Sequence, residues 1–174
     1  VHDADAHIME PPNWLRDHAD PGIRDRIDRP GYANELAQTG DGDHGGDQAR
    51  IDAAFARLVE RHRSDEFLEN EDVEVMNRKN FAATGAFLAE DRPRALDHIG
   101  VRSQLLFNTF HNRRLYDWEH QPDLDLAYGA ARAHNRGMIE FCSVDDRLLP
   151  TCYVPFADVD RADAMAAEAI DMGA

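Results

Sequence analysis

Three short segments of this chain have the hydrophobic patterns of β-strands. Over residues 2–8 apolar and polar residues alternate, as in a strand that buries one face. Residues 103–108 contain an unbroken Leu-Leu-Phe run, which is typical of a buried parallel strand, and residues 148–154 form a third apolar segment. We predict that the three strands are parallel neighbours joined by right-handed crossovers.

Apolar residues recur at helical spacing between and after these strands. Residues 49–62 form one amphipathic stripe, and residues 121–142 are predicted to form the longest helix. A last helix is expected at 159–172, with Asp158 as its N-cap and Gly173 as its C-cap. The segments alternate between strand and helix, so the sequence predicts an α/β fold.

The region between the first two strands, about residues 13–92, is predicted to be a mostly helical or irregular insertion. It begins with a short helix and turn at 13–27. Residues 31–48 are expected to be exposed and mobile, because their glycines and acidic residues cannot bury enough apolar surface. The spacing of Asp41, Asp43 and Asp52 resembles a calcium loop, but the terminal Glu is missing, so a solvated loop is favoured. We expect the insertion to pack on the domain or on another subunit, with a lid as the alternative.

The alternating first strand carries the most informative polar residues of the chain. Residues two apart in a strand point to the same side, so Asp3, Asp5 and His7 are expected on one face and Ala4, Ala6 and Ile8 on the other. A carboxylate and an imidazole at this spacing can bind one divalent metal ion. An edge strand with a solvated polar face is the alternative. A phosphatase of the haloacid dehalogenase type is disfavoured, because the long apolar strand that should precede its Asp-x-Asp motif is missing.

Asp5 and His7, followed by Glu10-Pro11-Pro12 and Trp14-Leu15, resemble the first strand of the amidohydrolase superfamily. The similar branch is the amidohydrolase 2 group of metal-dependent hydrolases and decarboxylases, related to aminocarboxymuconate-semialdehyde decarboxylase. Further weak similarities follow in the expected order at 94–107, 126–142 and 147–173, whereas the middle of the chain is not similar.

The resemblance implies that the chain is the N-terminal portion of a (β/α)8 TIM barrel, with the insertion after the first strand. Such a barrel usually needs about 250 residues, and this chain has 174. We therefore expect residues 1–174 to be part of a single metal-dependent hydrolase domain, with the remainder of the barrel outside this chain. The resemblance also implies a later His and Asp, which cannot be assigned here.

The resemblance to a barrel also places the candidate site residues. In a parallel barrel, functional residues lie where strands end and the following loops begin. Asp5 and His7 are the predicted metal ligands, while Asn108 and His111 are predicted to bind substrate, with a solvated loop as the alternative for His111. Glu10 is expected to brace a turn.

Two further polar features have structural explanations. Arg113 and Arg114 suit a substrate carboxylate, but surface ion pairs are favoured. Asn135 falls on the apolar stripe of its helix and is predicted to tie that helix to a neighbouring loop. The histidines His44, His62, His98 and His120 are expected at the surface.

The charge and cysteine content restrict the partners. Lys and Arg number 19 against 34 Asp and Glu, which gives a net charge of −15 and argues against nucleic acid or an anionic membrane as a partner. Without a signal peptide or a long apolar run, a soluble cytoplasmic protein is expected. Cys142 and Cys152 have no paired framework, so we expect reduced, buried thiols.

With Asp5 and His7 as ligands, the resemblance to the amidohydrolase superfamily implies an enzyme that uses Zn²⁺ or Mn²⁺. It also implies hydrolysis or non-oxidative decarboxylation of a small carboxylated or cyclic substrate, and the protein is expected to be a homo-oligomer. The alternative is a catalytically inactive amidohydrolase-like module that serves binding or oligomerisation. We expect this chain alone to be inactive, because two side chains hold a metal weakly.

Overall fold

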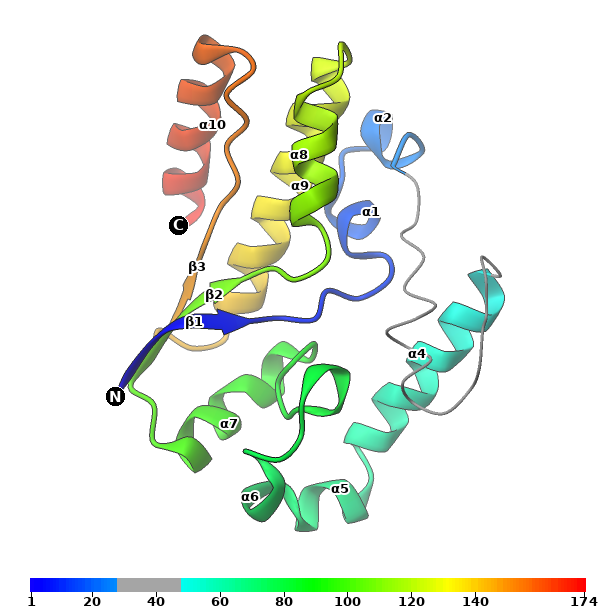
Figure 1. Cartoon of the computed structure of the whole chain (residues 1–174), viewed down its shortest axis with the longest axis vertical. Helices are drawn as coiled ribbons and strands as arrows, with labels where there is room; N and C mark the ends of the chain where they lie inside the picture. Colours follow the sequence, from blue (N-terminus) through cyan, green and yellow to red (C-terminus); the bar gives the residue numbers. More distant parts are fainter. Residues whose placement is uncertain (28–47) are drawn as a thin grey trace.

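A computed structural model of the chain describes residues 1–27 and 48–174. The predicted loop at 31–48, and with it most of the alternative calcium loop, lies outside the described residues except for Gln48. Figure 1 shows the three strands side by side at mid-height, near the N-terminus, with helices above and below them.

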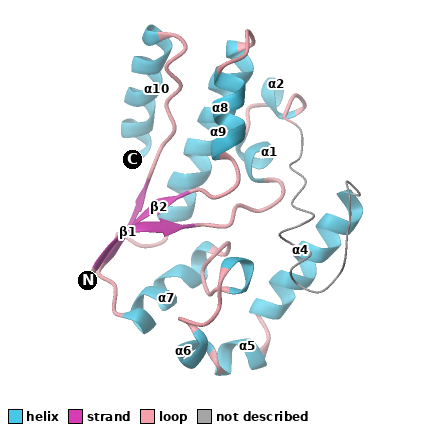
Figure 2. Ribbon diagram, in the orientation of Figure 1, coloured by secondary structure: helices cyan, strands magenta, loops and turns pink. Residues whose placement is uncertain are grey.

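The strands β1 (His2–His7), β2 (Ser103–Phe107) and β3 (Leu148–Pro150) form one parallel sheet in the order β1-β2-β3. The predicted parallel neighbours and their order are confirmed. The third strand is shorter than the predicted 148–154, and the chain beyond it forms no regular strand (Figure 2).

A β-bulge in β1 changes which side chains share a face. Asp3 pairs with Gln104 and Ala6 pairs with Leu106, so two residues of β1 lie opposite the single residue Leu105. Because paired residues in a sheet point to the same side, Asp3 lies on the side of Gln104 and Leu106. The prediction that Asp3 shares a face with His7 is therefore wrong, and Ala4 is exposed rather than buried.

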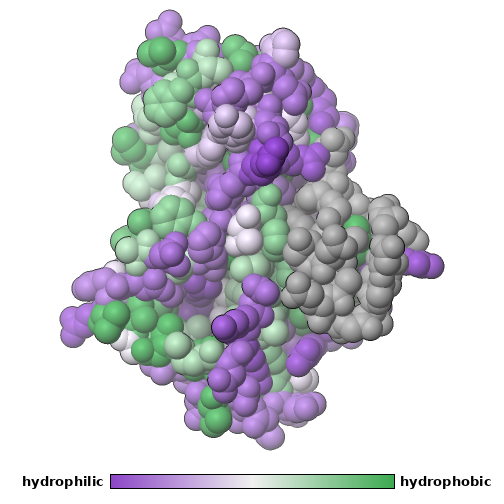
Figure 3. Space-filling model, in the orientation of Figure 1, coloured by the Kyte–Doolittle hydropathy of each residue, from purple (hydrophilic) through white to green (hydrophobic). Residues whose placement is uncertain are grey.

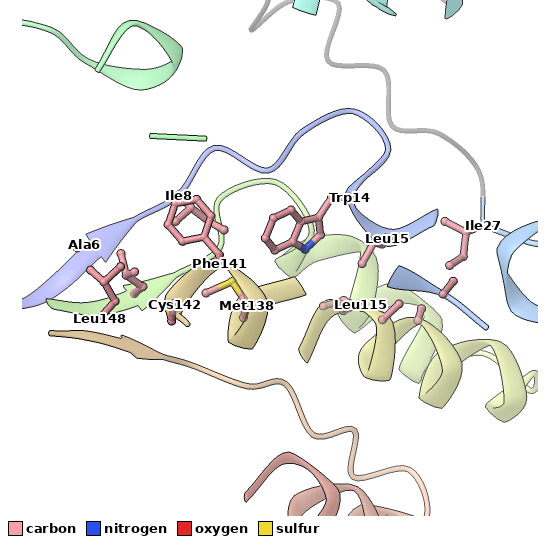
Figure 4. Packing of buried hydrophobic residues seen from close by; sticks show 14 of the residues in the cluster. Ala6, Ile8, Trp14, Leu15, Ile27, Leu115, Met138, Phe141, Cys142 and Leu148 are labelled. Carbon is pink, nitrogen blue, oxygen red and sulfur yellow. The ribbon is translucent and has the colours of Figure 1, made fainter. Parts of the chain in front are cut away.

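Helices cover one face of this sheet and bury the main hydrophobic core against it. Leu106 is fully buried there, and Ala6, Ile8 and Leu148 of the strand region pack against Met138 and Phe141 of the long helix α9 (Leu124–Cys142). Figure 4 shows these side chains meeting between strands and helix. We call this side the covered face. The opposite side, with His7, Leu105, Phe107 and Leu149, is the open face, whose residues are half-buried or exposed.

The helices agree with the sequence pattern except around residue 112. The described helices are α1 (Trp14–His18), α2 (Pro21–Arg24), α4 (Gln48–His62), α5 (Asp65–Glu69), α6 (Glu71–Glu74), α7 (Arg92–Ile99), α8 (Asn112–Glu119), α9 and α10 (Val159–Met172), with the 3-10 turns η1 (Asn80–Ala82) and η2 (Ala89–Asp91). The helices predicted at 49–62 and 159–172 are confirmed, with Asp158 accepting from the Arg161 N–H and Gly173 at φ 113°.

The helix α8 was not predicted, and α9 begins later than residue 121. The apolar pattern of α8 is short, since only Leu115 and Trp118 of that helix are buried. Pro122 follows it, and Asp123 then caps α9 by accepting a hydrogen bond from the Leu126 N–H at 3.2 Å. A capping residue inside the predicted helix therefore set the true boundary.

The insertion forms a second, smaller hydrophobic cluster. Ile51 and Leu58 of α4 pack with Phe81 and Phe87. His62 joins the aromatic rings beside this cluster, where it stacks on Phe67 with a ring-centroid distance of 4.1 Å and is 1 % exposed. The expected surface position of His62 is wrong, because this residue continues the buried stripe of α4 four residues after Leu58. His98 and His120 are exposed as predicted.

Of the two cysteines, Cys142 is buried and Cys152 is half-buried, and both are free thiols. Hydrophilic residues cover much of the face shown in Figure 3, in line with the net charge of −15. Within residues 1–27 and 48–174, no helix combines the length and the apolar character needed to cross a membrane.

Candidate metal centre

Asp5 and His7 lie together at the C-terminal end of β1. The distance from Nε2 of His7 to Oδ1 of Asp5 is 3.5 Å, which places both side chains on the open face. The side chains are 42 % exposed for His7 and 90 % exposed for Asp5, so solutes can reach both of them. The structure therefore brings together the two residues that were predicted to bind metal.

The loop after β2 fixes the orientation of the His7 ring. Nδ1 of His7 lies 3.0 Å from the carbonyl oxygen of Asn108, which can only accept a hydrogen bond. Nδ1 is thereby assigned as a donor, and Nε2 is the nitrogen that faces Asp5. Metal-binding histidines usually donate their second N–H to a carbonyl or carboxylate in this way. The ring of His7 therefore has the orientation that a metal ligand needs, with Nε2 directed to the open face.

The spacing of the two donor atoms also fits one metal ion. Two atoms bound at about 2.0–2.2 Å in a tetrahedral arrangement lie roughly 3.4 Å apart. The observed separation is 3.5 Å. Among the described residues no group of three or more His, Cys, Asp or Glu side chains is arranged to hold a metal. The pair Asp5 and His7 thus provides two ligands, and other groups or water would have to complete the coordination.

Glu10 braces the loop that holds His7, as expected. Its carboxylate is fully buried and accepts hydrogen bonds from the N–H groups of Thr109 at 2.9 Å, Phe110 at 3.1 Å and His111 at 3.2 Å. Burial raises the pKa of the Glu10 carboxyl, and these N–H groups oppose that rise. Glu10, which lies shortly after β1, therefore fixes the loop that presents the Asn108 carbonyl to His7.

The residues predicted to bind substrate lie below the surface. Asn108 is 3 % exposed, and its contact with His7 uses the main-chain carbonyl rather than the side chain. His111 is 1 % exposed, and burial together with the nearby His134 and Arg114 lowers its pKa to about 3. The ring of His111 lies in the interior, whereas a ring in direct contact with a substrate would have to lie on the open face. The alternative of a solvated His111 is wrong for the same reason.

The arginines beyond this loop make local contacts. Nε of Arg113 lies 3.5 Å from Oδ2 of Asp117 one turn later in α8, which confirms the expected surface ion pair. The guanidinium of Arg114 lies over the ring of Trp118. These contacts account for both side chains without a substrate.

Thr109, which the sequence placed after the second strand, lies with Oγ1 3.4 Å from Nδ1 of His7. Sequence reasoning missed two polar residues behind the pair, Gln104 and Arg92, which are buried on the covered face. A signal was available for Gln104, since it is a polar residue within an otherwise apolar strand. Arg92 lacked such a signal, because a charged residue at the start of a helix is normally exposed.

The comparisons with known proteins give no independent support for a family. No protein-family model matches this chain, and no curated protein is significantly similar to it. The resemblance to the amidohydrolase superfamily rests on the motifs alone and stays a prediction.

Proposed function

We propose that this chain contributes to a divalent-metal enzyme of the amidohydrolase type. The observation that carries the proposal is the pairing of Asp5 with Nε2 of His7 on the open face, with the orientation of the His7 ring set by Asn108. An ordinary surface ion pair between the two side chains would be worth about 0–1 kcal/mol. The donor spacing and the orientation of the ring also fit a metal site, which is the reading that we propose.

The residues present suit Zn²⁺ or Mn²⁺, with Asp5 and His7 as ligands. A bound divalent ion supplies a polarising charge that activates water or a substrate oxygen. The chain itself supplies one carboxylate and one imidazole, and the Asn108 carbonyl holds Nδ1 of the ring so that Nε2 faces the site. The reaction that we propose is hydrolysis or non-oxidative decarboxylation of a small carboxylated or cyclic substrate.

We also propose that the parallel sheet is the first part of a (β/α)8 barrel. The order β1-β2-β3 with helices on one face supports this architecture. On the other face Leu149 is 46 % exposed, although it lies in a strand. A homo-oligomer remains part of the proposal, with the insertion as the candidate contact.

The test is metal binding by the 174-residue chain. Zn²⁺ affinity is measured by calorimetry and Mn²⁺ affinity by electron paramagnetic resonance. We expect one weak site, and a decrease in affinity of at least about tenfold in Asp5→Asn and in His7→Ala, because each removes a ligand. Two control variants, Asp163→Asn in α10 and His120→Ala at the α8 C-cap, remove the same functional groups from exposed positions. They should leave the metal affinity unchanged.

Two results would overturn the proposal. One is a protein that binds neither ion at millimolar concentration even when the rest of the proposed barrel is present, since this chain supplies only two ligands. The other is an affinity that Asp5→Asn and His7→Ala leave unchanged, because the metal would then bind elsewhere. Either result would favour the alternative of a catalytically inactive binding or oligomerisation module.

A further inference from the structure

We propose that Asp3, Gln104 and Arg92 form a buried hydrogen-bonded chain that positions Asp5 and His7 from the opposite side of the sheet. This inference rests on the proposed metal site and names the residues that set its geometry. None of the three faces the metal, because they lie on the covered side of β1 and β2. They are positioning residues and act through the backbone.

Asp3 shapes the bulge that carries Asp5. Oδ1 of Asp3 accepts a hydrogen bond from the Asp5 main-chain N–H at 3.1 Å, which closes a short loop inside the strand. Oδ2 of Asp3 accepts from Nε2 of Gln104 at 3.0 Å, which ties the bulge to β2. The bulge turns Asp3 to the covered face and leaves Asp5 beside His7. A single carboxylate thus sets the backbone from which Asp5 projects.

Arg92 connects this arrangement to His7. Its Nε donates to Oε1 of Gln104 at 2.8 Å, and its Nη1 donates to the main-chain carbonyl of His7 at 3.2 Å and of Gly85 at 3.1 Å. One guanidinium therefore holds the His7 backbone directly and the Asp5 backbone through Gln104 and Asp3. The separation of the two proposed ligands depends on both connections.

Burial of the polar side chains of Gln104 and Arg92 costs free energy, so their presence needs an explanation. Arg92 is 8 % exposed and Gln104 is 5 % exposed; burial lowers the pKa of the Arg92 guanidinium, and the charge of Asp3 opposes this change. Apolar residues of similar volume would often stabilise such a position as well or better. A planar guanidinium with fixed donors specifies direction, which apolar contacts do not. The residue types therefore suit a positioning role.

The donor and the acceptor of the hydrogen bond between residues 3 and 104 can be exchanged without losing a bond, and this exchange provides the test. In Asp3→Asn the new amide N–H₂ meets the amide N–H₂ of Gln104, so one contact is lost. In the double variant Asp3→Asn, Gln104→Glu, the new carboxylate at 104 accepts from both Asn and Arg92, while the Asn oxygen still accepts from the Asp5 N–H. We expect Zn²⁺ affinity to fall about tenfold in the single variant and to return to within about threefold of wild type in the double variant.

Two further readouts separate positioning from simple stabilisation. The absorption spectrum of bound Co²⁺ reports ligand geometry, and it should change in Asp3→Asn and recover in the double variant. Without any metal, amide hydrogen exchange at Asp5 should become at least about tenfold faster in Asp3→Ala, relative to wild type and to Asp163→Ala. The free energy of unfolding is measured alongside, so that affinity is compared per folded molecule.

The outcomes distinguish this proposal from the one on which it rests. If the protein binds no metal even with the rest of the proposed barrel present, the proposed function fails, whatever the exchange rate of Asp5. If wild type binds Zn²⁺ but Asp3→Asn leaves both the affinity and the Co²⁺ spectrum unchanged, the positioning role is overturned. Unchanged exchange at Asp5 in Asp3→Ala would overturn it independently.

Discussion

The side-chain amide of Asn135 hydrogen-bonds to both main-chain groups of Tyr153. Nδ2 of Asn135 donates to the Tyr153 carbonyl at 3.0 Å, and the Tyr153 N–H donates to Oδ1 of Asn135 at 2.7 Å. Asn135 is 1 % exposed in the middle of α9, and Tyr153 lies in the segment that leaves β3. The pair therefore anchors the connection between β3 and α10 on the central helix.

Replacing Asn135 by Ala should destabilise the protein. Two main-chain groups of Tyr153 would lose their partner in a mostly buried place, which costs about 2–4 kcal/mol in the free energy of unfolding. Urea denaturation followed by circular dichroism measures this change. The exposed Asn77 serves as control, and Asn77→Ala should stay within about 0.5 kcal/mol of wild type. Equal effects at the two positions would contradict the anchoring role.

Glu10→Gln should loosen the loop after β2. The carboxylate of Glu10 accepts hydrogen bonds from Thr109, Phe110 and His111, and an amide turns one acceptor atom into a donor. We expect the free energy of unfolding to fall by about 2–3 kcal/mol. Hydrogen exchange of the Thr109 amide should become faster. In the matched control, Glu69→Gln at an exposed position, both quantities should keep their wild-type values.

Gly137 is required by close packing against Trp14. A Cβ atom at position 137 would lie 2.6 Å from Cε2 and 2.7 Å from Cζ2 of the Trp14 ring. Gly137→Ala should therefore lower the free energy of unfolding by about 1–3 kcal/mol. Gly22 has no heavy atom within 4 Å of such a Cβ and lies in α2, so Gly22→Ala should be neutral or stabilise by up to about 1 kcal/mol. The ranking of the two variants in urea denaturation tests this difference.

Buried histidines should make the protein sensitive to acid. Burial and the nearby His18 lower the pKa of His134 from 6.5 to about 4, and burial lowers the pKa of His111 to about 3 and also lowers that of His62. As the pH falls below about 6.5, the unfolded chain takes up protons that the folded protein does not. Above about pH 7 the titration of these histidines therefore does not change the free energy of unfolding. Between about pH 6.5 and 4 the free energy of unfolding decreases, by roughly 3 kcal/mol for His134.

The experiment compares the pH dependence of unfolding in two proteins. The free energy of unfolding is measured from pH 7.5 to 4.5 for wild type and for His134→Gln, which cannot take up a proton. We expect a shallower decrease in the variant, whatever its stability at pH 7.5. Parallel curves would mean that His134 is protonated as easily in the folded protein as in the unfolded chain, against this prediction.

The sequence by itself determined the elements whose signals are local. The apolar runs specified three parallel strands in the correct order, and Asp158 and Gly173 specified both ends of α10. The amphipathic stripe of α9 indicated that Asn135 would be buried and tied to a neighbouring loop. Local patterns suffice here because hydrophobic periodicity and capping depend on residues only a few positions apart.

Which polar residues face the candidate site depends on contacts between distant parts of the chain. Strict alternation placed Asp3 beside His7, whereas the bulge, which depends on contacts with Gln104 a hundred residues away in β2, placed it on the other face. His62 is buried because its ring contacts the Phe81 carbonyl, and His111 is buried where the Glu10 carboxylate accepts from its main-chain N–H; both partners come from distant segments, which no local pattern reports. A polar side chain is exposed or buried according to whether the fold supplies its hydrogen bonds, and that depends on which distant residues the fold brings together.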